Sequence, residues 1–318
     1  MTIMVEQKGN IGYLIKKMRE KQGISQSELC RGLCSNVALY RIENGERDVE
    51  ISLAARFFQR LGYSSDKFEL YGGAEEFQRY EMQQTIRLHR EKHQFGQMEE
   101  LLNVYEKMYS EERSGVGLQF LLSNRGVLEI QKKNYPAGIS LMEHAISCTV
   151  PDWEKESWSQ WILGEDELDL FVFLADAHED KGEKEAAFQI REGILKYLDQ
   201  KCVSKEQVVK LYTRTICGMA PYLLEEGHNR KCLSLCECGL TVLAETKWLS
   251  CWPELLYWKG KSQEALWKSG EEKIEEKQII GSFQRAYYIF RLLNNPEMAE
   301  KTKECLEVYG WESIRLEK

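Results

Sequence analysis

The sequence predicts an all-α fold in two parts, a small bundle of short helices followed by a long array of paired helices. Only 5 prolines occur in 318 residues, and proline is the residue that interrupts helices most strongly. Apolar residues recur three and four positions apart along most of the chain, which is the spacing of one helix face. Short segments rich in glycine, asparagine and proline separate these stretches and mark the loops between helices.

The composition is that of a globular protein. Hydrophobic residues make up 43% of the chain and charged residues 30%, and no apolar run approaches the roughly 20 residues that span a bilayer. The first ten residues lack the apolar core of an export signal. We therefore expect a cytoplasmic protein with no membrane partner, in which the 10 cysteines stay reduced.

Charge is distributed unevenly between the two parts. Residues 1–71 carry 11 lysines and arginines against 9 aspartates and glutamates, whereas the whole chain has a net charge of −8. A slightly basic first part therefore precedes an acidic remainder. Because nucleic acid repels an acidic surface, only the first part is expected to approach DNA.

Four short helices are predicted in the first part, at about 10–21, 26–33, 36–44 and 51–62. Ser25 is a good N-cap for the second helix, and Glu28 three residues later completes a capping box. Gly45 ends the third helix, because glycine readily adopts the left-handed conformation found there. A short turn joins the second and third helices, which is the layout of a helix-turn-helix domain.

The residues around this turn carry a specific resemblance. The stretches Met18–Cys30 (MREKQGISQSELC) and Tyr40–Arg47 (YRIENGER) resemble the XRE, or lambda-repressor-like, helix-turn-helix family. The resemblance implies a DNA-binding domain at residues 1–71 and a buried ion pair between Arg19 and Glu43. Tyr40 replaces the serine usual in the family, and the turn is one residue shorter than in the commonest members, so the exact base contacts stay open.

The same segment contains candidates for DNA contact. Gln26, at the start of the second helix, can reach a phosphate with its side-chain amide. Residues at the start of the third helix and one turn further on can point into a major groove. The predicted DNA-binding set is Gln26, Ser35, Asn36, Val37, Tyr40 and Arg41. The alternative is a helical bundle that makes no DNA contact.

Residues 72–318 are predicted to form helices throughout, at about 76–93, 96–109, 112–132, 136–148, 165–181, 184–199, 204–226, 229–245, 252–269, 276–293 and 296–309. The second helices of successive pairs begin about 40 to 48 residues apart, a longer interval than the roughly 34 residues of a tetratricopeptide repeat. The stretch Ala175–Ala187 nevertheless resembles the core of that repeat, with small residues where two helices meet. Helix pairs of this kind stack to bury their apolar faces, so we expect a degenerate tetratricopeptide-like α-solenoid.

The order and size of the two parts resemble the bacterial peptide-pheromone regulators of the Rap–Rgg–NprR–PlcR–PrgX group. The resemblance implies a homodimer whose concave face holds a short signalling peptide. This chain departs from the group where related proteins carry paired residues with peptide-binding asparagines. It has Val172 and Phe173 at one such pair and Tyr212 and Thr213 at another, so peptide recognition is expected to differ.

The first helix of each pair is expected to line the concave face. An asparagine there can hold a peptide backbone, and apolar residues can form a pocket or simply pack between repeats. The acidic helix at 165–180 is either a solvated face or a selector for a basic group on the ligand, through Asp169 and Asp176. The predicted peptide-binding set is Asn124, Asp169, Phe173, Asp176, Tyr212, Thr215 and Met219.

One cluster of cysteines could have a chemical role. His228, Cys232 and Cys236 share a helix face, with Cys238 nearby, and could present soft ligands to zinc or copper, act as a redox sensor, or form a buried stripe of small residues. No C-x2-C spacing accompanies the cluster, and we predict neither a metal nor a cofactor. The chain has no P-loop, nucleophile elbow, zincin or dinucleotide-binding motif, so we do not expect an enzyme.

Two functions follow from these patterns. The first is a sequence-specific transcriptional regulator that binds double-stranded DNA at an operator, dimerises through its helical body and senses a short signalling peptide. The second is a protein-interaction adaptor whose solenoid binds a partner protein. Asn36, Val37 and Arg41 favour the regulator, because an adaptor has no need of base-reading side chains.

Overall fold

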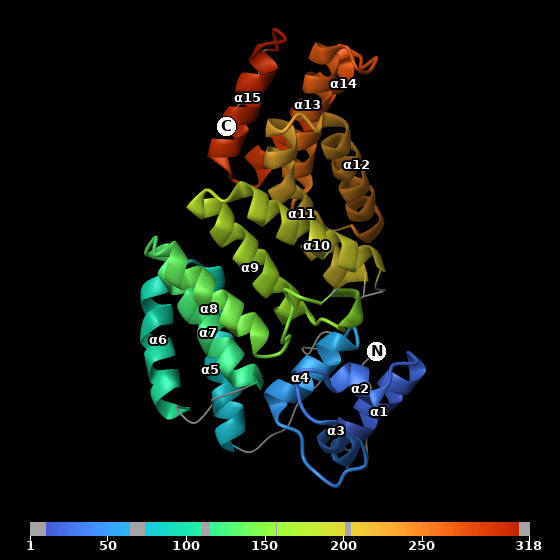
Figure 1. The fold of residues 1–318 in the computed structure, drawn as a ribbon. Helices are drawn as coiled ribbons and strands as arrows, with labels where there is room; N and C mark the ends of the chain where they lie inside the picture. The colour runs from blue at the N-terminus through green and yellow to red at the C-terminus, as the bar shows by residue number, and fades with distance from the viewer. Residues whose placement is uncertain are drawn as a thin grey trace. The chain divides into compact units, whose positions relative to one another are not determined.

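A computed structural model describes residues 11–63, 74–109, 115–156, 158–200, 205–247 and 249–311. Every regular element in these ranges is a helix, which confirms the predicted all-α class (Figure 1). The expected boundary between residues 71 and 72 lies outside the described residues. No helix in the described ranges combines the length and apolar character needed to cross a bilayer.

Four helices form the N-terminal head: α1 (Ile11–Lys21), α2 (Gln26–Cys30), α3 (Asn36–Glu43) and α4 (Ile51–Arg60). The predicted capping box is present at the start of α2, where Ser25 and Glu28 satisfy each other's main-chain N–H groups. The core of the head takes apolar side chains from all four helices, among them Ile15, Leu29, Leu39, Phe57 and Phe58. Helix α2 ends at Cys30 rather than near residue 33, because Gly32 turns the chain with a left-handed φ of 75°.

The helices of the repeats lie where the sequence predicted them, with ends displaced by a few residues at most. They are α5 (Ala74–Glu91), α6 (Phe95–Met108), α7 (Gly115–Gln131), α8 (Tyr135–Ser147), α9 (Glu165–Lys181), α10 (Lys184–Gln200), α11 (Lys205–Glu225), α12 (Asn229–Thr246), α13 (Trp252–Ser269), α14 (Glu276–Leu292) and α15 (Pro296–Glu307). A 3-10 turn, Trp158–Gln160, lies in the long connection between α8 and α9.

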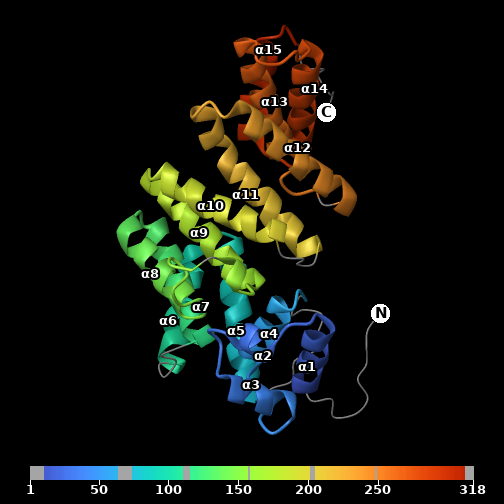
Figure 2. The same ribbon diagram turned by 45° about the vertical axis from the view of Figure 1, so that its right-hand side comes forward.

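The chain divides into two compact units, residues 1–190 and residues 191–318. In the first unit α5 packs on α6 and α7 packs on α8, and α4 of the head packs on α5, α7 and α9, as both ribbon views show (Figure 2). In the second unit each helix from α11 to α15 packs on the next one along the chain. These successive hairpins confirm the predicted degenerate tetratricopeptide-like solenoid.

A buried ion pair fixes the helices of the head relative to one another. Arg19 Nε lies 2.7 Å from Glu43 Oε1, and Arg19 Nη2 lies 2.8 Å from Glu43 Oε2. Arg19 Nη1 donates a third hydrogen bond to the main-chain oxygen of Ile24 at 2.8 Å. The hydrogen bond to Glu43 raises the pKa of Arg19 despite its burial. The pair joins α1 to α3 and confirms what the family resemblance implied.

Removing one partner of this pair is expected to destabilise the head strongly. The change Glu43→Ala leaves the charge of Arg19 buried and uncompensated, which costs roughly 3–5 kcal/mol in comparable cases. Thermal unfolding followed by circular dichroism measures the loss. Glu46→Ala, an exposed site on the same head, is the control and should leave the midpoint unchanged. Equal midpoints for the two variants would contradict a stabilising role for the pair.

Candidate DNA-binding surface and ligand pocket

Helix α3 turns one face toward solvent. Its other face is buried in the head through Leu39, Ile42 and Glu43. Ser35 caps the helix, because its side-chain oxygen accepts a hydrogen bond from the main-chain N–H of Ala38 at 3.2 Å. The exposed face therefore begins with the first helical residue and carries Asn36, Val37, Tyr40 and Arg41.

Two of these exposed side chains are apolar. Val37 is 60% exposed and Tyr40 is 53% exposed, although α3 has a buried face that other apolar residues occupy. In a major groove, apolar side chains contact the methyl group of thymine, and arginine donates two hydrogen bonds to guanine. Together with Arg41, Val37 and Tyr40 give the exposed face of α3 the kinds of side chain that can contact base edges.

Two of the predicted DNA contacts also have partners inside the head. Gln26 Nε2 donates to Glu43 Oε2 at 2.6 Å, and Asn36 Oδ1 accepts from Cys30 Sγ at 2.8 Å. A side-chain amide carries two N–H donors and one oxygen acceptor. Gln26 therefore keeps one N–H for a phosphate, and the amide nitrogen of Asn36 is not used by these bonds. The sequence did not reveal these restraints.

Helix α4 joins the head to the repeats because both of its faces are buried. Its apolar face, with Ala54, Phe57 and Phe58, belongs to the core of the head. Its second face is polar and carries Arg56, Gln59 and Arg60, which are also buried. Nothing in the sequence pattern marked these polar residues as functional. They contact α7 and α9, so α4 lies between two layers of protein.

Arg60 holds the end of α4 to both the head and the repeats. Its Nη2 and Nε lie 2.7 Å and 3.2 Å from the two carboxylate oxygens of Glu167. The same guanidinium donates to the main-chain oxygens of Leu29, Arg31 and Thr149, at 3.0, 2.6 and 3.3 Å. Burial alone would raise the pKa of Glu167, but the charges of Arg60 and of the nearby Arg56 outweigh it and lower that pKa. Glu167 is therefore an ionised partner, with a side chain only 1% exposed.

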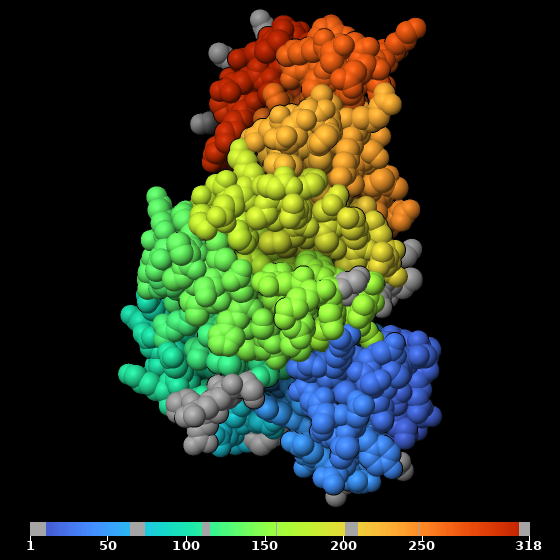
Figure 3. Space-filling model, viewed as in Figure 1, coloured from blue at the N-terminus to red at the C-terminus, as the bar shows by residue number. Residues whose placement is uncertain are grey.

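The turn that follows α2 lies directly against the main chain of the repeats. A Cβ atom on Gly32 would lie 2.0 Å from the main-chain oxygen of Thr149, so no larger residue fits there without moving the turn. Beside it, Arg31 Nη2 lies 2.6 Å from Glu156 Oε2, and its guanidinium stacks 4.0 Å above the ring of Trp161. The space-filling view shows the blue head directly against green segments of the repeats (Figure 3).

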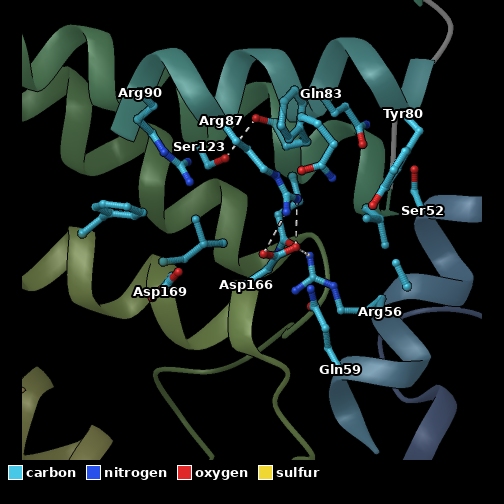
Figure 4. Close-up of a pocket in the computed structure, with 17 residues that line it drawn as sticks. Ser52, Arg56, Gln59, Tyr80, Gln83, Arg87, Arg90, Ser123, Asp166 and Asp169 are labelled. Atoms are coloured by element: carbon cyan, nitrogen blue, oxygen red, sulfur yellow. Dashed lines mark hydrogen bonds and ion pairs between the residues drawn. The ribbon is translucent and has the colours of Figure 1, made fainter. Parts of the chain in front are cut away.

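A second cluster of charges lines a pocket between α4, α5, α7 and α9 (Figure 4). Arg87 and Arg56 reach Asp166 from different helices, with Nη2 atoms 2.9 Å and 3.4 Å from Asp166 Oδ2. Arg56 Nη2 also donates to Gln119 Oε1 at 2.8 Å. Burial opposes the charge on Asp166, but the charges of Arg87 and Arg56 hold its pKa far below the usual range. One carboxylate is thus shared by two guanidinium groups.

The pocket has a volume of about 640 Å³, part of which is open to solvent. Its lining residues are Ser52, Ala55, Arg56, Gln59, Tyr80, Gln83, Gln84, Arg87, Arg90, Val116, Gln119, Phe120, Ser123, Asp166, Asp169, Leu170 and Phe173. In this lining three arginines face two aspartates, which leaves one positive charge in excess. All the repeat residues in the lining come from α5, α7 and α9, the first helices of their pairs.

Two carboxylates at the acidic start of α9 are paired with arginines rather than solvated. Glu167 is enclosed with Arg60, and Asp166 binds Arg56 and Arg87. Asp169 lines a pocket in which arginines outnumber carboxylates, a setting that favours a negatively charged group over the basic one predicted from the sequence. The opposing arginines lie 79 to 110 residues earlier in the chain, where local sequence patterns could not pair them with α9.

Two of the seven predicted peptide contacts, Asp169 and Phe173, line this pocket. Asn124 lies behind Arg90, whose Nη1 donates to Asn124 Oδ1 at 3.3 Å. Asn124 is 0% exposed and donates its own N–H to the main-chain oxygen of Phe120. Asn124 is thus buried and hydrogen-bonded in this structure, and its predicted contact with a ligand stays a prediction.

The other predicted peptide contacts do not line the pocket. Asp176 is half-buried further along α9. Tyr212, Thr215 and Met219 belong to α11 in the second unit. Thr215 and Met219 are 1% exposed, and Thr215 Oγ1 donates to the main-chain oxygen of Leu211 at 2.7 Å. Both side chains are buried in this structure, and their predicted contact with a ligand stays a prediction.

The cysteine cluster lies on α12. Cys232 and Cys236 are buried and Cys238 is exposed. Cys232 Sγ donates to the main-chain oxygen of Ala220 on the neighbouring helix at 3.8 Å. Among the described residues no group of three or more histidine, cysteine or acidic side chains is gathered around a point where a metal ion could bind. The buried placement is that of a stripe of small residues packed against α11.

Comparison with known proteins agrees with the geometry of the head. Residues 15–68 match the helix-turn-helix family. No curated protein matches the chain in sequence. The helix-turn-helix domain inferred from the turn is therefore confirmed.

Solved structures are similar over nearly the whole chain. PlcR of Bacillus thuringiensis in complex with the peptide PapR7 and DNA is 17% identical, with a TM-score of 0.54, over 92% of this chain and 98% of that chain. The apo form of PlcR is 18% identical, with a TM-score of 0.52, over the same shares. The apo form of the competence regulator ComR from Streptococcus vestibularis is 18% identical, with a TM-score of 0.48, over 95% and 99%. At these identities the similarity is one of fold, and the two PlcR structures confirm the combination of a helix-turn-helix head with a helical-repeat body.

The pair of Arg60 and Glu167 is expected to make stability depend on pH. The pKa of Glu167 is lower in the folded chain than its unfolded value of about 4.3, so its contribution is present above that pH and is lost as pH falls below it. Glu167→Gln leaves the charge of Arg60 buried and should cost roughly 3–5 kcal/mol at pH 7.

Chemical denaturation at neutral and acidic pH tests this expectation. The gap in stability between the parent and Glu167→Gln should begin to close as the pH falls below about 4.3, where the unfolded parent takes up a proton, and should go on closing until the pH passes the lower pKa of the folded chain. Asp180→Asn, at an exposed site of the same helix, should behave as the parent at both values. A gap that is the same at both pH values would show that the charge of Glu167 does not stabilise the contact between the head and the repeats.

Proposed function

We propose that this protein is a sequence-specific DNA-binding transcriptional regulator whose helical body senses a short peptide. The observation that carries the proposal is the outer face of α3, where Val37, Tyr40 and Arg41 are exposed on a helix anchored from behind by Leu39 and Ile42. Such a helix can enter a major groove without unfolding any part of the head. The match of residues 15–68 to the helix-turn-helix family supports the same function.

The regulator is proposed to act as a homodimer. One helix-turn-helix head reads only part of a helical turn of DNA, and two heads bound to half-sites about one turn apart supply the specificity of an operator. The similarity in fold to PlcR, which was crystallised with a peptide and DNA, supports a peptide as the ligand. The pocket between α4, α5, α7 and α9 is the proposed place of contact, because it joins the head to the first helices of the repeats.

An adaptor that binds only another protein accounts less well for these features. The solenoid alone fits either function. An adaptor gives no reason for exposed apolar and basic side chains on the outer face of α3, whereas base readout uses both kinds. Loss of specific DNA binding in a folded chain with altered α3 would separate the two functions.

Arg41→Ala is expected to weaken specific binding by about 1–3 kcal/mol and to relax the preference at one base position, because arginine donates two hydrogen bonds to guanine. Sites are first selected from random duplex DNA with the parent chain and then measured by gel shift at fixed salt. Arg230→Ala, which removes a 68% exposed arginine of the second unit, is the matched control. If both variants bind the selected site as the parent does, α3 does not read it.

Val37 is expected to contact a thymine methyl group. Replacing thymine by uracil in the selected half-site removes only that methyl and should weaken the parent by about 0.8 kcal/mol, or about fourfold, for each contacted methyl. Val37→Ala should bind the thymine site more weakly and lose most of the difference between thymine and uracil. Equal affinity of the parent for both sites would contradict a methyl contact.

A further inference from the structure

We propose that Arg56, Arg87 and Arg90 form a binding site for a carboxylate group, so that the ligand is anchored through a negative charge where the head meets the repeats. This inference rests on the proposed ligand sensing and names the chemistry of the group recognised. The acidic sequence of α9 suggested a basic group on the ligand, whereas this proposal assigns the ligand a negatively charged group. The three arginines come from two segments of the first unit, α4 and α5, and converge on one pocket (Figure 4).

The first support is the charge balance of the pocket. Asp166 is already shared by Arg87 and Arg56, and the lining holds one more guanidinium than carboxylates. Arg90 donates to the neutral amide of Asn124 and stacks 5.0 Å from the ring of Phe173. Burial and the neighbouring charge of Arg87 lower the pKa of Arg90, and the nearby Asp169 and Asp166 offset this lowering only in part. A bound anion would offset the remaining part.

The second support is a set of unused donors on a buried cation. The side chain of Arg56 is 3% exposed, and its Nε and Nη1 atoms are enclosed without a hydrogen-bond partner. Buried N–H donors are nearly always paired, because an unpaired donor keeps the full cost of leaving water. A guanidinium group presents its donors as a planar fork, and a carboxylate matches that fork with two oxygens.

The lining also selects among anions. A phosphate group carries close to two negative charges at neutral pH and would meet Asp166 and Asp169 in the same pocket. A carboxylate carries one charge, which equals the excess positive charge of the lining. Gln83, Ser52 and Ser123 supply neutral polar groups around the arginines. Because part of the pocket is open to solvent, a carboxylate carried by a larger molecule can enter it.

The carboxylate can belong to the C-terminus of a peptide or to an acidic side chain, and three pools of short random peptides distinguish these sources. The first has a free C-terminus and no aspartate or glutamate. The second has an amidated C-terminus and contains both acidic residues. The third is amidated and contains neither. The full chain is incubated with each pool, and the retained peptides are identified by mass spectrometry. Retention from the first or second pool, but not from the third, is the expected result.

Variants of Arg90 test the site itself. Arg90→Gln should weaken a retained peptide roughly 10- to 100-fold, the range for loss of a charge-assisted hydrogen bond, and Arg90→Lys should recover part of the loss. Arg125→Gln is the matched control, because Arg125 is also half-buried but pairs with Glu106 on the side of α6. Equal retention from the third pool, or unchanged affinity in Arg90→Gln, would overturn the proposal.

Acetate and acetamide separate failure of this site from failure of the proposed peptide sensing. Both probes are titrated into the full chain, and arginine side-chain signals are followed by nuclear magnetic resonance. A response to acetate that is absent with acetamide and lost in Arg90→Gln supports the carboxylate site even if no peptide is retained. A parent chain that responds to neither a carboxylate peptide nor acetate shows that the site is wrong, whereas DNA binding is measured independently by gel shift.

Discussion

The burial of α4 on both of its faces determines how the first unit is built. Its apolar face completes the core of the head, while Arg60 on the other face binds Glu167 and three main-chain oxygens of the surrounding segments. A buried charge of this kind is tolerated only when its partners are complete, because removing one leaves the rest desolvated and unpaired. The head is thus held against the repeats by contacts whose geometry allows little variation.

This arrangement links α3, which carries the proposed DNA-reading surface, to the repeats through a short series of contacts. Glu43 on α3 binds Arg19 on α1, and both helices share a core with α4. Arg60 on α4 then binds Glu167 on α9. Each step is a buried ion pair or a packed apolar contact rather than a flexible connection, so the repeats of the first unit fix the orientation of α3.

Local sequence patterns predicted the helices and the head well, because caps, glycine stops and apolar spacing act over a few residues. The family resemblance supplied the pair of Arg19 and Glu43, since both lie within one motif. The pocket could not be predicted in this way. Asp166 meets arginines that lie 79 and 110 residues away, and a charged stretch such as 165–180 looks the same whether its partners are solvent or buried guanidinium groups. The sequence does place Arg56 and Arg60 one helical turn apart on α4. Their role becomes apparent only once α4 is known to pack between the head and the repeats.

The pocket and the contact between the head and the repeats both depend on α4. Arg56 and Arg60 lie one turn apart on α4, the first in the pocket and the second in the pair with Glu167. A ligand that contacts Arg56 binds only the arrangement in which α4 is docked between α7 and α9. By linkage, such a ligand stabilises that arrangement by the same free energy that docking contributes to its affinity. Because α4 shares the core of the head with α3, the proposed ligand would contact the same helix that anchors α3 to the repeats.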